Sequence, residues 1–72
     1  MPKLKIKTFG QAGEEICEVE QAGYLLDFEG RMVMVDGQRV QSYQELAGLA
    51  SQEKYLSQEF LEVIQLPAIV GG

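Results

Sequence analysis

Several residue types on which active sites depend are missing from this chain. It contains no histidine and no tryptophan, and its single cysteine, Cys17, has no second cysteine with which to form an internal disulfide. Without histidine there is no Ser–His or Cys–His pair for nucleophilic catalysis, and the chain carries no metal-ligand cluster and no glycine-rich phosphate-binding loop. We therefore do not expect a self-sufficient enzyme, and we expect no metal and no bound cofactor.

Long apolar runs and an excess of positive charge are also absent. No stretch approaches the ~20 apolar residues of a membrane span, and the opening MPKLKIKTFG lacks the apolar core of a signal peptide. A cytoplasmic protein is the resulting expectation, and the lack of disulfides suits a reducing compartment. Six basic residues against eleven acidic ones give a net charge of −5, which disfavours binding to nucleic acid or to an anionic membrane. A partner with a basic surface is the natural complement of this overall charge.

What remains is the composition of one small globular domain. The chain has 72 residues, of which 46% are hydrophobic and 24% charged, and this is not the profile of a disordered segment. A chain of this length buries only about 60% of its unfolded surface, so its core is modest. No repeat, low-complexity segment or internal linker divides it.

The first twenty residues predict a β-hairpin. In KLKIKTF, lysines alternate with Leu4 and Ile6, which is the period of a strand with one solvated face. GQAG, residues 10–13, reads as a four-residue loop, and EEICEVEQ returns as a second strand. Folding about this loop predicts four cross-strand pairs: Leu4 with Val19, Ile6 with Cys17, Lys3 with Glu20, and Lys5 with Glu18. Cys17 then faces inward as a small buried hydrophobic residue.

The middle of the chain predicts a second hairpin and leaves one segment open. Residues 21–30, which contain two glycines, form either a short strand or one turn of helix, because they are too few for a long helix. The apolar run from Met32 to Val35 suits a strand covered on both faces, and its methionines are expected to fill the core in preference to forming an adaptable binding surface. Asp36-Gly37 follows, and this dipeptide is the strongest short hairpin signal available.

The clearest helical signal lies in the C-terminal half. Ser42 with Glu45 three residues later predicts a capping box. The residues that can share one face of the helix are Tyr43, Leu46, Leu49 or Ala50, and Leu56. A possible break near residue 51 leaves open whether there is one helix or two. FLEVIQL, residues 60–66, is apolar enough for a strand in the middle of the sheet, and Pro67 ends the hydrogen bonding of that strand.

These elements together predict an α+β fold. We expect a mixed sheet of four or five strands with one or two helices, and a main helix displaced toward the C-terminal half. The domain spans residues 1–66, and residues 67–72 form a flexible C-terminal tail that ends in Gly-Gly.

The tail is the most unusual part of the sequence. LPAIVGG contains no charged side chain, whereas chain ends usually fray into polar residues. Gly71 and Gly72 have no side chains, so a partner enzyme could thread them through a narrow channel to reach the terminal carboxylate. The residues expected to contact such a partner are Leu66, Pro67, Ala68, Ile69 and Val70, the last two as apolar anchors. A carboxylate on such an arm can act as a nucleophile or, once activated, as an acyl donor.

In KLKIKTFGQAGEEICEVE, VMVDGQRV and above all LEVIQLPAIVGG, the sequence resembles the ubiquitin-like sulfur carrier proteins. These include the sulfur carriers of thiamine biosynthesis, the small subunit of molybdopterin synthase, and related carriers for amino-acid biosynthesis and tRNA thiolation. The resemblance implies a β-grasp fold. The family's main helix lies between its second and third strands, where this chain has only residues 21–30, so we expect a shortened or rearranged β-grasp.

The same resemblance implies a function. An E1-like adenylating enzyme would use ATP to activate the carboxylate of Gly72, sulfur would displace AMP, and the resulting thiocarboxylate would be delivered to a sulfur-accepting biosynthetic enzyme. The pathway would be that of a cofactor, thiamine or molybdopterin, or of an amino acid. Gly72 is then the reacting residue, with Gly71 beside it. Two alternatives stay open: a ubiquitin-like modifier conjugated to protein amines, and a non-covalent interaction domain.

Overall fold

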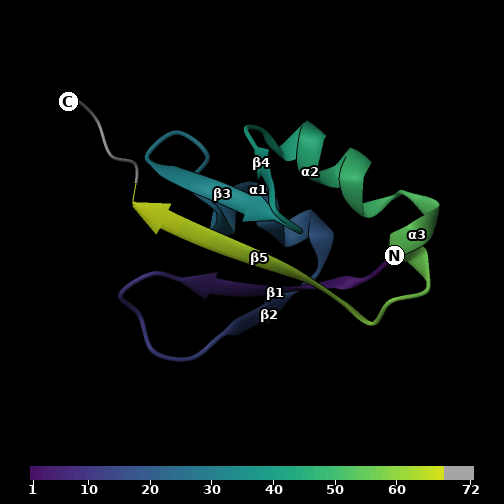
Figure 1. Cartoon of the computed structure of the whole chain (residues 1–72), viewed down its shortest axis with the longest axis horizontal. Coiled ribbons are helices and arrows are strands. Elements are labelled where there is room, and N and C mark those ends of the chain that lie inside the picture. The colour runs from purple at the N-terminus through teal and green to yellow at the C-terminus, as the bar shows by residue number, and fades with distance from the viewer. Residues whose placement is uncertain (68–72) are drawn as a thin grey trace.

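A five-stranded mixed sheet with the strand order β2-β1-β5-β3-β4 forms the body of the protein (Figure 1). The structure is a computed structural model, and it describes residues 1–67. In chain order the elements are β1 (Lys3–Thr8), β2 (Glu15–Cys17), the 3-10 helix η1 (Val19–Gln21), α1 (Ala22–Leu25), β3 (Arg31–Val35), β4 (Gln38–Val40), α2 (Tyr43–Ala50), α3 (Glu53–Leu56) and β5 (Phe60–Pro67). The predicted α+β, β-grasp-like fold is therefore confirmed.

The two central strands, β1 and β5, run parallel although they come from opposite ends of the chain. Leu4 lies opposite Leu61, and Ile6 lies opposite Val63. All four side chains are buried, because side chains alternate between the two faces of a sheet and this register places these four on the same face. β5 also pairs with β3 in the antiparallel direction, so the expected central position of the last strand is confirmed. Both central strands run away from the N-terminus and α3, so β5 ends at the opposite end of the molecule (Figure 1).

The opening hairpin forms with a register that differs from the predicted one by two residues. Leu4 lies opposite Cys17 and Ile6 lies opposite Glu15. The predicted pairs of Leu4 with Val19 and Ile6 with Cys17 are therefore wrong. A shift by two residues keeps every side chain on its face of the sheet. The burial predicted for Cys17 is accordingly confirmed.

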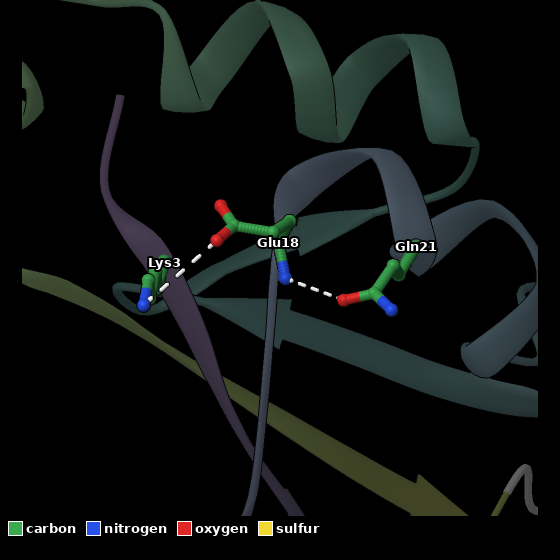
Figure 2. Close-up of polar contacts among 3 residues, drawn as sticks. All are labelled: Lys3, Glu18 and Gln21. Atoms are coloured by element: carbon green, nitrogen blue, oxygen red, sulfur yellow. Dashed lines mark hydrogen bonds and ion pairs between the residues drawn. The ribbon is translucent and has the colours of Figure 1, made fainter.

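The cause of the shift lies at Glu18, directly after β2. Its backbone N–H donates to Gln21 Oε1 at 2.9 Å, and η1 starts here instead of a longer strand (Figure 2). Across the hairpin, Lys3 Nζ lies 3.8 Å from Glu18 Oε1. The predicted pairings of Lys3 with Glu20 and of Lys5 with Glu18 are therefore wrong. The observed ion pair is solvent-exposed, so it contributes little to stability.

The segment between β2 and β3 is helical. η1 runs directly into the single turn of α1. Asp27 Oδ1 then accepts a hydrogen bond from Gly30 N at 2.8 Å and closes the turn that leads into β3. Of the two alternatives for residues 21–30, the helical turn is the correct one. The longest helix is α2, so the expected displacement of the main helix toward the C-terminal half is confirmed.

The second hairpin turns at the predicted Asp-Gly pair. Asp36 has φ of 50° and Gly37 has φ of 79°, the left-handed conformations that a type I′ turn requires. The two valines of β3 are buried, whereas Met32 and Met34 on its other side are only half-buried. The prediction of a strand covered on both faces, with methionines in the core, is wrong because the helices cover one face alone.

All the helices pack against the same face of the sheet. Ala22 of α1, Leu46 of α2 and Tyr55 of α3 share one core with the inward residues of the strands. Half of the predicted capping box forms at the start of α2: Ser42 Oγ accepts a hydrogen bond from Glu45 N at 3.1 Å, whereas Glu45 Oε2 accepts from Gln41 N instead of Ser42 N. The predicted break separates α2 from α3. Because of this break, the residues of α3 that face the core do not continue the helical spacing of α2.

The break moves one predicted core residue to the surface. Leu56 was expected on the buried helical face with Leu46, and it is 49% exposed. Tyr55 takes the buried place in α3, with 3% of its surface exposed.

The other face of the sheet has no helix over it within residues 1–67, and we refer to it as the open face. Its side chains are those that alternate with the core residues of each strand. They are Lys3, Lys5, Lys7 and Phe9 along β1 and its continuation, Ile16 on β2, Met32 and Met34 on β3, Arg39 on β4, and Phe60, Glu62, Ile64 and Leu66 on β5.

Candidate functional site

β5 carries the chain toward the predicted tail. Its last two residues pair with β3, Leu66 opposite Met32 and Pro67 opposite Arg31. The strand therefore includes Pro67, one residue beyond the predicted end of the domain. The remaining predicted site residues lie outside the described residues: Ala68, Ile69, Val70, Gly71 and Gly72.

An open apolar groove lies beside the end of β5. It has a volume of about 440 Å³ and is lined by Phe9, Met32, Leu66 and Pro67. Phe9, which follows β1, is 68% exposed, while Leu66 and Met32 are half-buried. An apolar side chain from a partner could bury surface here, next to the residue at which β5 ends.

The groove joins two predicted partner-binding residues, Leu66 and Pro67, to Met32 and Phe9. For Met32 the sequence favours the core over a binding surface, and for Phe9 it predicts no role. Phe9 nevertheless carries a signal in the sequence, because it continues the odd-numbered series of the solvated lysines on β1. An aromatic side chain in the same alternating series as these lysines is expected on the solvent-facing side of the sheet.

The end of β5 is held in place by a buried amide, Gln65. Its Oε1 accepts a hydrogen bond from Asp27 N at 3.1 Å, and its Nε2 donates to Thr8 Oγ1 at 3.0 Å. Only 5% of Gln65 is exposed. Its backbone carbonyl also accepts a hydrogen bond from Phe9 N at 2.9 Å. These hydrogen bonds connect the ends of β1 and β5 with the loop before β3, next to the groove.

Cys17 is the only thiol in the chain, and its surroundings make it unreactive. The side chain lies in the core on the inner face of β2, with 6% of its surface exposed. Burial, followed by the nearby charges of Glu15 and Glu18, raises the pKa of the Cys17 thiol. The thiol is therefore protonated at neutral pH, and a protonated thiol is a poor nucleophile.

The apolar groove is the feature of the described residues that lies nearest to the predicted tail. Within residues 1–67 no three carboxylate or cysteine side chains gather closely enough to hold a metal ion. None of the helices in that range has the length and hydropathy needed to cross a membrane. The groove lies at the edge of the sheet, where the sequence continues as AIVGG.

The chain was also compared with known proteins. No family model, no curated protein and no solved structure matches it, so the family resemblance rests on the residues quoted for it.

Proposed function

We propose that the protein is a sulfur carrier whose reactive group is the carboxylate of Gly72. One observation carries the proposal: the central strand β5 is paired with β1 as far as Gln65 and with β3 as far as Pro67, beside an apolar groove, and the sequence then continues as AIVGG. A firmly held strand followed by a short arm without bulky terminal side chains suits delivery of a carboxylate into another enzyme. Extended in an enzyme's channel, five residues span at most about 18 Å.

The proposed reaction takes place on partner enzymes. In the first step, an E1-like enzyme catalyses attack of the Gly72 carboxylate on the α-phosphorus of ATP, which forms an acyl-adenylate and releases pyrophosphate. In the second step, a sulfur nucleophile attacks the acyl carbon and expels AMP, leaving a thiocarboxylate. The carrier itself contributes recognition and a narrow arm, since Gly71 and Gly72 add no side chains to the channel.

The thiocarboxylate then delivers its sulfur to an acceptor enzyme. The proposed destination is the biosynthesis of thiamine, of molybdopterin or of an amino acid. The fold is common to all three routes, so the acceptor decides among them, and a gene for an acceptor beside the gene for this chain would identify the route.

Intact-mass spectrometry tests the proposal. The purified protein is incubated with the activating enzyme from the same genome, ATP and sulfide, and its mass is expected to rise by about 16 Da as sulfur replaces oxygen. Deletion of Gly72 is expected to abolish the shift, and the variant should remain folded because the buried core lies between Leu4 and Val63. Lys54→Ala, on α3 and outside the groove, serves as the control and is expected to react as the wild type does.

Other outcomes contradict the proposal in different ways. Unchanged mass while the enzyme consumes ATP with a known carrier would exclude the sulfur-carrier function. Higher-mass adducts in cells, with a Gly-Gly remnant on lysines of other proteins, would indicate a modifier instead. Partner binding that survives removal of residues 67–72, without activation, would indicate a non-covalent interaction domain. The intact mass of protein from native cells also measures directly whether Gly72 is the carboxyl terminus of the mature protein.

A further inference from the structure

We propose that the open face binds an acidic protein surface with an apolar centre, and that this surface belongs to the activating enzyme. The inference deepens the proposed function and rests on it for the identity of the partner. It is carried by the arrangement of charge and apolar surface on the open face, which is the reverse of what the overall charge of the chain suggests.

The register of the strands places an apolar block at the centre of the open face. Ile64 on β5 lies opposite Met34 on β3, and one step toward the groove Leu66 lies opposite Met32. Phe9 extends this block at the side of β1 through the groove. Ile64 is 43% exposed and Phe9 is 68% exposed. The block is therefore continuous from the middle of the sheet to the end of β5.

Two cations flank this block in the same row of the sheet. Lys7 of β1 lies opposite Ile64, and Arg39 of β4 lies opposite Met34. The row thus reads Lys7, Ile64, Met34, Arg39 across four strands. Neither cation forms an ion pair with another residue in the range 1–67. The one ion pair within that range joins Lys3 to Glu18.

Positive charge is concentrated on this face. Four of the six basic residues of the chain lie here: Lys3, Lys5, Lys7 and Arg39. Only Glu62 among the acidic residues belongs to the face, with Glu18 at its edge. Lys3 is engaged by Glu18, and Lys5 Nζ lies 4.6 Å from the centre of the Phe60 ring. Lys7 and Arg39 are therefore the cations that a partner's carboxylates can meet.

The mixture of charge and apolar surface favours a protein as the occupant. A polyanion such as RNA would meet the two flanking cations but would leave the central Ile64 and Met34 in water, and the net charge of −5 would repel it. A second copy of the chain would bring like charges together, since an isologous contact repeats the same cationic rows on both sides. An acidic protein surface with an apolar centre can pair its carboxylates with the two flanking cations and cover the apolar residues between them.

Matched variants test the inference through the dissociation constant for the activating enzyme. Lys7→Glu and Arg39→Glu are each expected to raise Kd at least about tenfold, because they place like charges at the contact. Lys54→Glu on α3 makes the same change of charge outside the face and is expected to change Kd less than about twofold. Ile64→Ala is likewise expected to raise Kd about tenfold, whereas Leu56→Ala, which removes an apolar side chain of similar exposure, is not.

The same samples separate this inference from the proposed function. Wild-type affinity in the Lys7, Arg39 and Ile64 variants, with the mass shift at Gly72 retained, would overturn the docking face and leave the carrier function standing. Loss of binding in these variants, without any mass shift in the wild type, would keep the docking face and remove the carrier function. A wild-type protein that does not bind the enzyme would overturn both.

Three further measurements address the other occupants. Tighter binding of the wild type to single-stranded RNA or to phosphatidylserine vesicles than to the enzyme, lost in Lys7→Glu, would assign the face to a polyanion. Self-association of the wild type that Ile64→Ala abolishes would assign it to a second copy. Circular dichroism and urea unfolding of each variant confirm that the losses do not come from misfolding.

Discussion

At the scale of single residues, Gln65 does most to position the candidate site. It is the only buried amide or charged side chain among the described residues, and each end of its amide has a partner. A polar group at such a position is costly unless it is satisfied, so its hydrogen bonds hold the end of β5 against the end of β1. In the sequence it is an unremarkable glutamine in an alternating strand, because its partners Thr8 and Asp27 are distant along the chain.

We predict that Gln65→Ala destabilises the protein by about 1 to 3 kcal/mol, because Asp27 N and Thr8 Oγ1 lose their partner and a cavity forms. Urea unfolding followed by circular dichroism measures the change. Gln58→Ala, which alters an exposed glutamine, is the control and is expected to lie within about 0.5 kcal/mol of wild type. Equal stability of the Gln65 and Gln58 variants would contradict the role of the amide.

At the scale of elements, the turn between β3 and β4 is tied to α3. Tyr55 is buried, and its hydroxyl donates a hydrogen bond to Asp36 Oδ2 at 2.5 Å. Asp36 holds a positive φ, a conformation that Asn and Asp tolerate better than most residues. The Asp-Gly turn was predictable because its signal is local. Its bond to Tyr55 was not predictable, since it depends on where the break after α2 places α3.

Substitution of Asp36 tests both functions of that residue. Asp36→Ala is expected to cost about 1 to 3 kcal/mol of unfolding free energy, because it removes the acceptor for a buried hydroxyl and strains the turn. Asp36→Asn should retain most of the stability, since its amide oxygen accepts the bond and Asn adopts positive φ. Denaturant unfolding of Asp36→Ala, Tyr55→Phe and the double variant forms a cycle. Strict additivity of the two single changes would show that the hydrogen bond contributes nothing.

At the scale of the whole molecule, the two faces of the sheet have different tasks. The inner face is filled by the helices, and the open face presents an apolar block flanked by cations. Two adjacent residues of β5 show the difference between the faces: Val63 is fully buried, and Ile64 is 43% exposed. One strand therefore serves stability with one row of side chains and recognition with the other.

We predict that Val63→Ala lowers the free energy of unfolding by roughly 2 to 3 kcal/mol, since it leaves a cavity in the core. Ile64→Ala is expected to lower it by less than about 1 kcal/mol, while it weakens partner binding. Parallel urea titrations of the two variants measure the contrast. A large loss of stability in Ile64→Ala would mean that the open face is part of the folded core and not a free surface.

Local signals in the sequence determined the elements of this protein. Alternation indicated β1, apolar content indicated β5, Asp36-Gly37 indicated the second hairpin, and Ser42 marked the start of α2. These signals act between neighbours in the chain, so they are readable without the fold. The α+β class followed from them, and the resemblance to the sulfur carriers supplied the β-grasp expectation.

Only the tertiary structure decided the register, the faces and the site. The hairpin register moved by two residues because Glu18 begins η1, and Met32 left the expected core because the helices occupy one face. The groove gathers Phe9, Met32 and Leu66 from three strands or strand ends, far apart in the sequence. Such contacts depend on how strands pair over long separations, and no short stretch of sequence encodes that pairing.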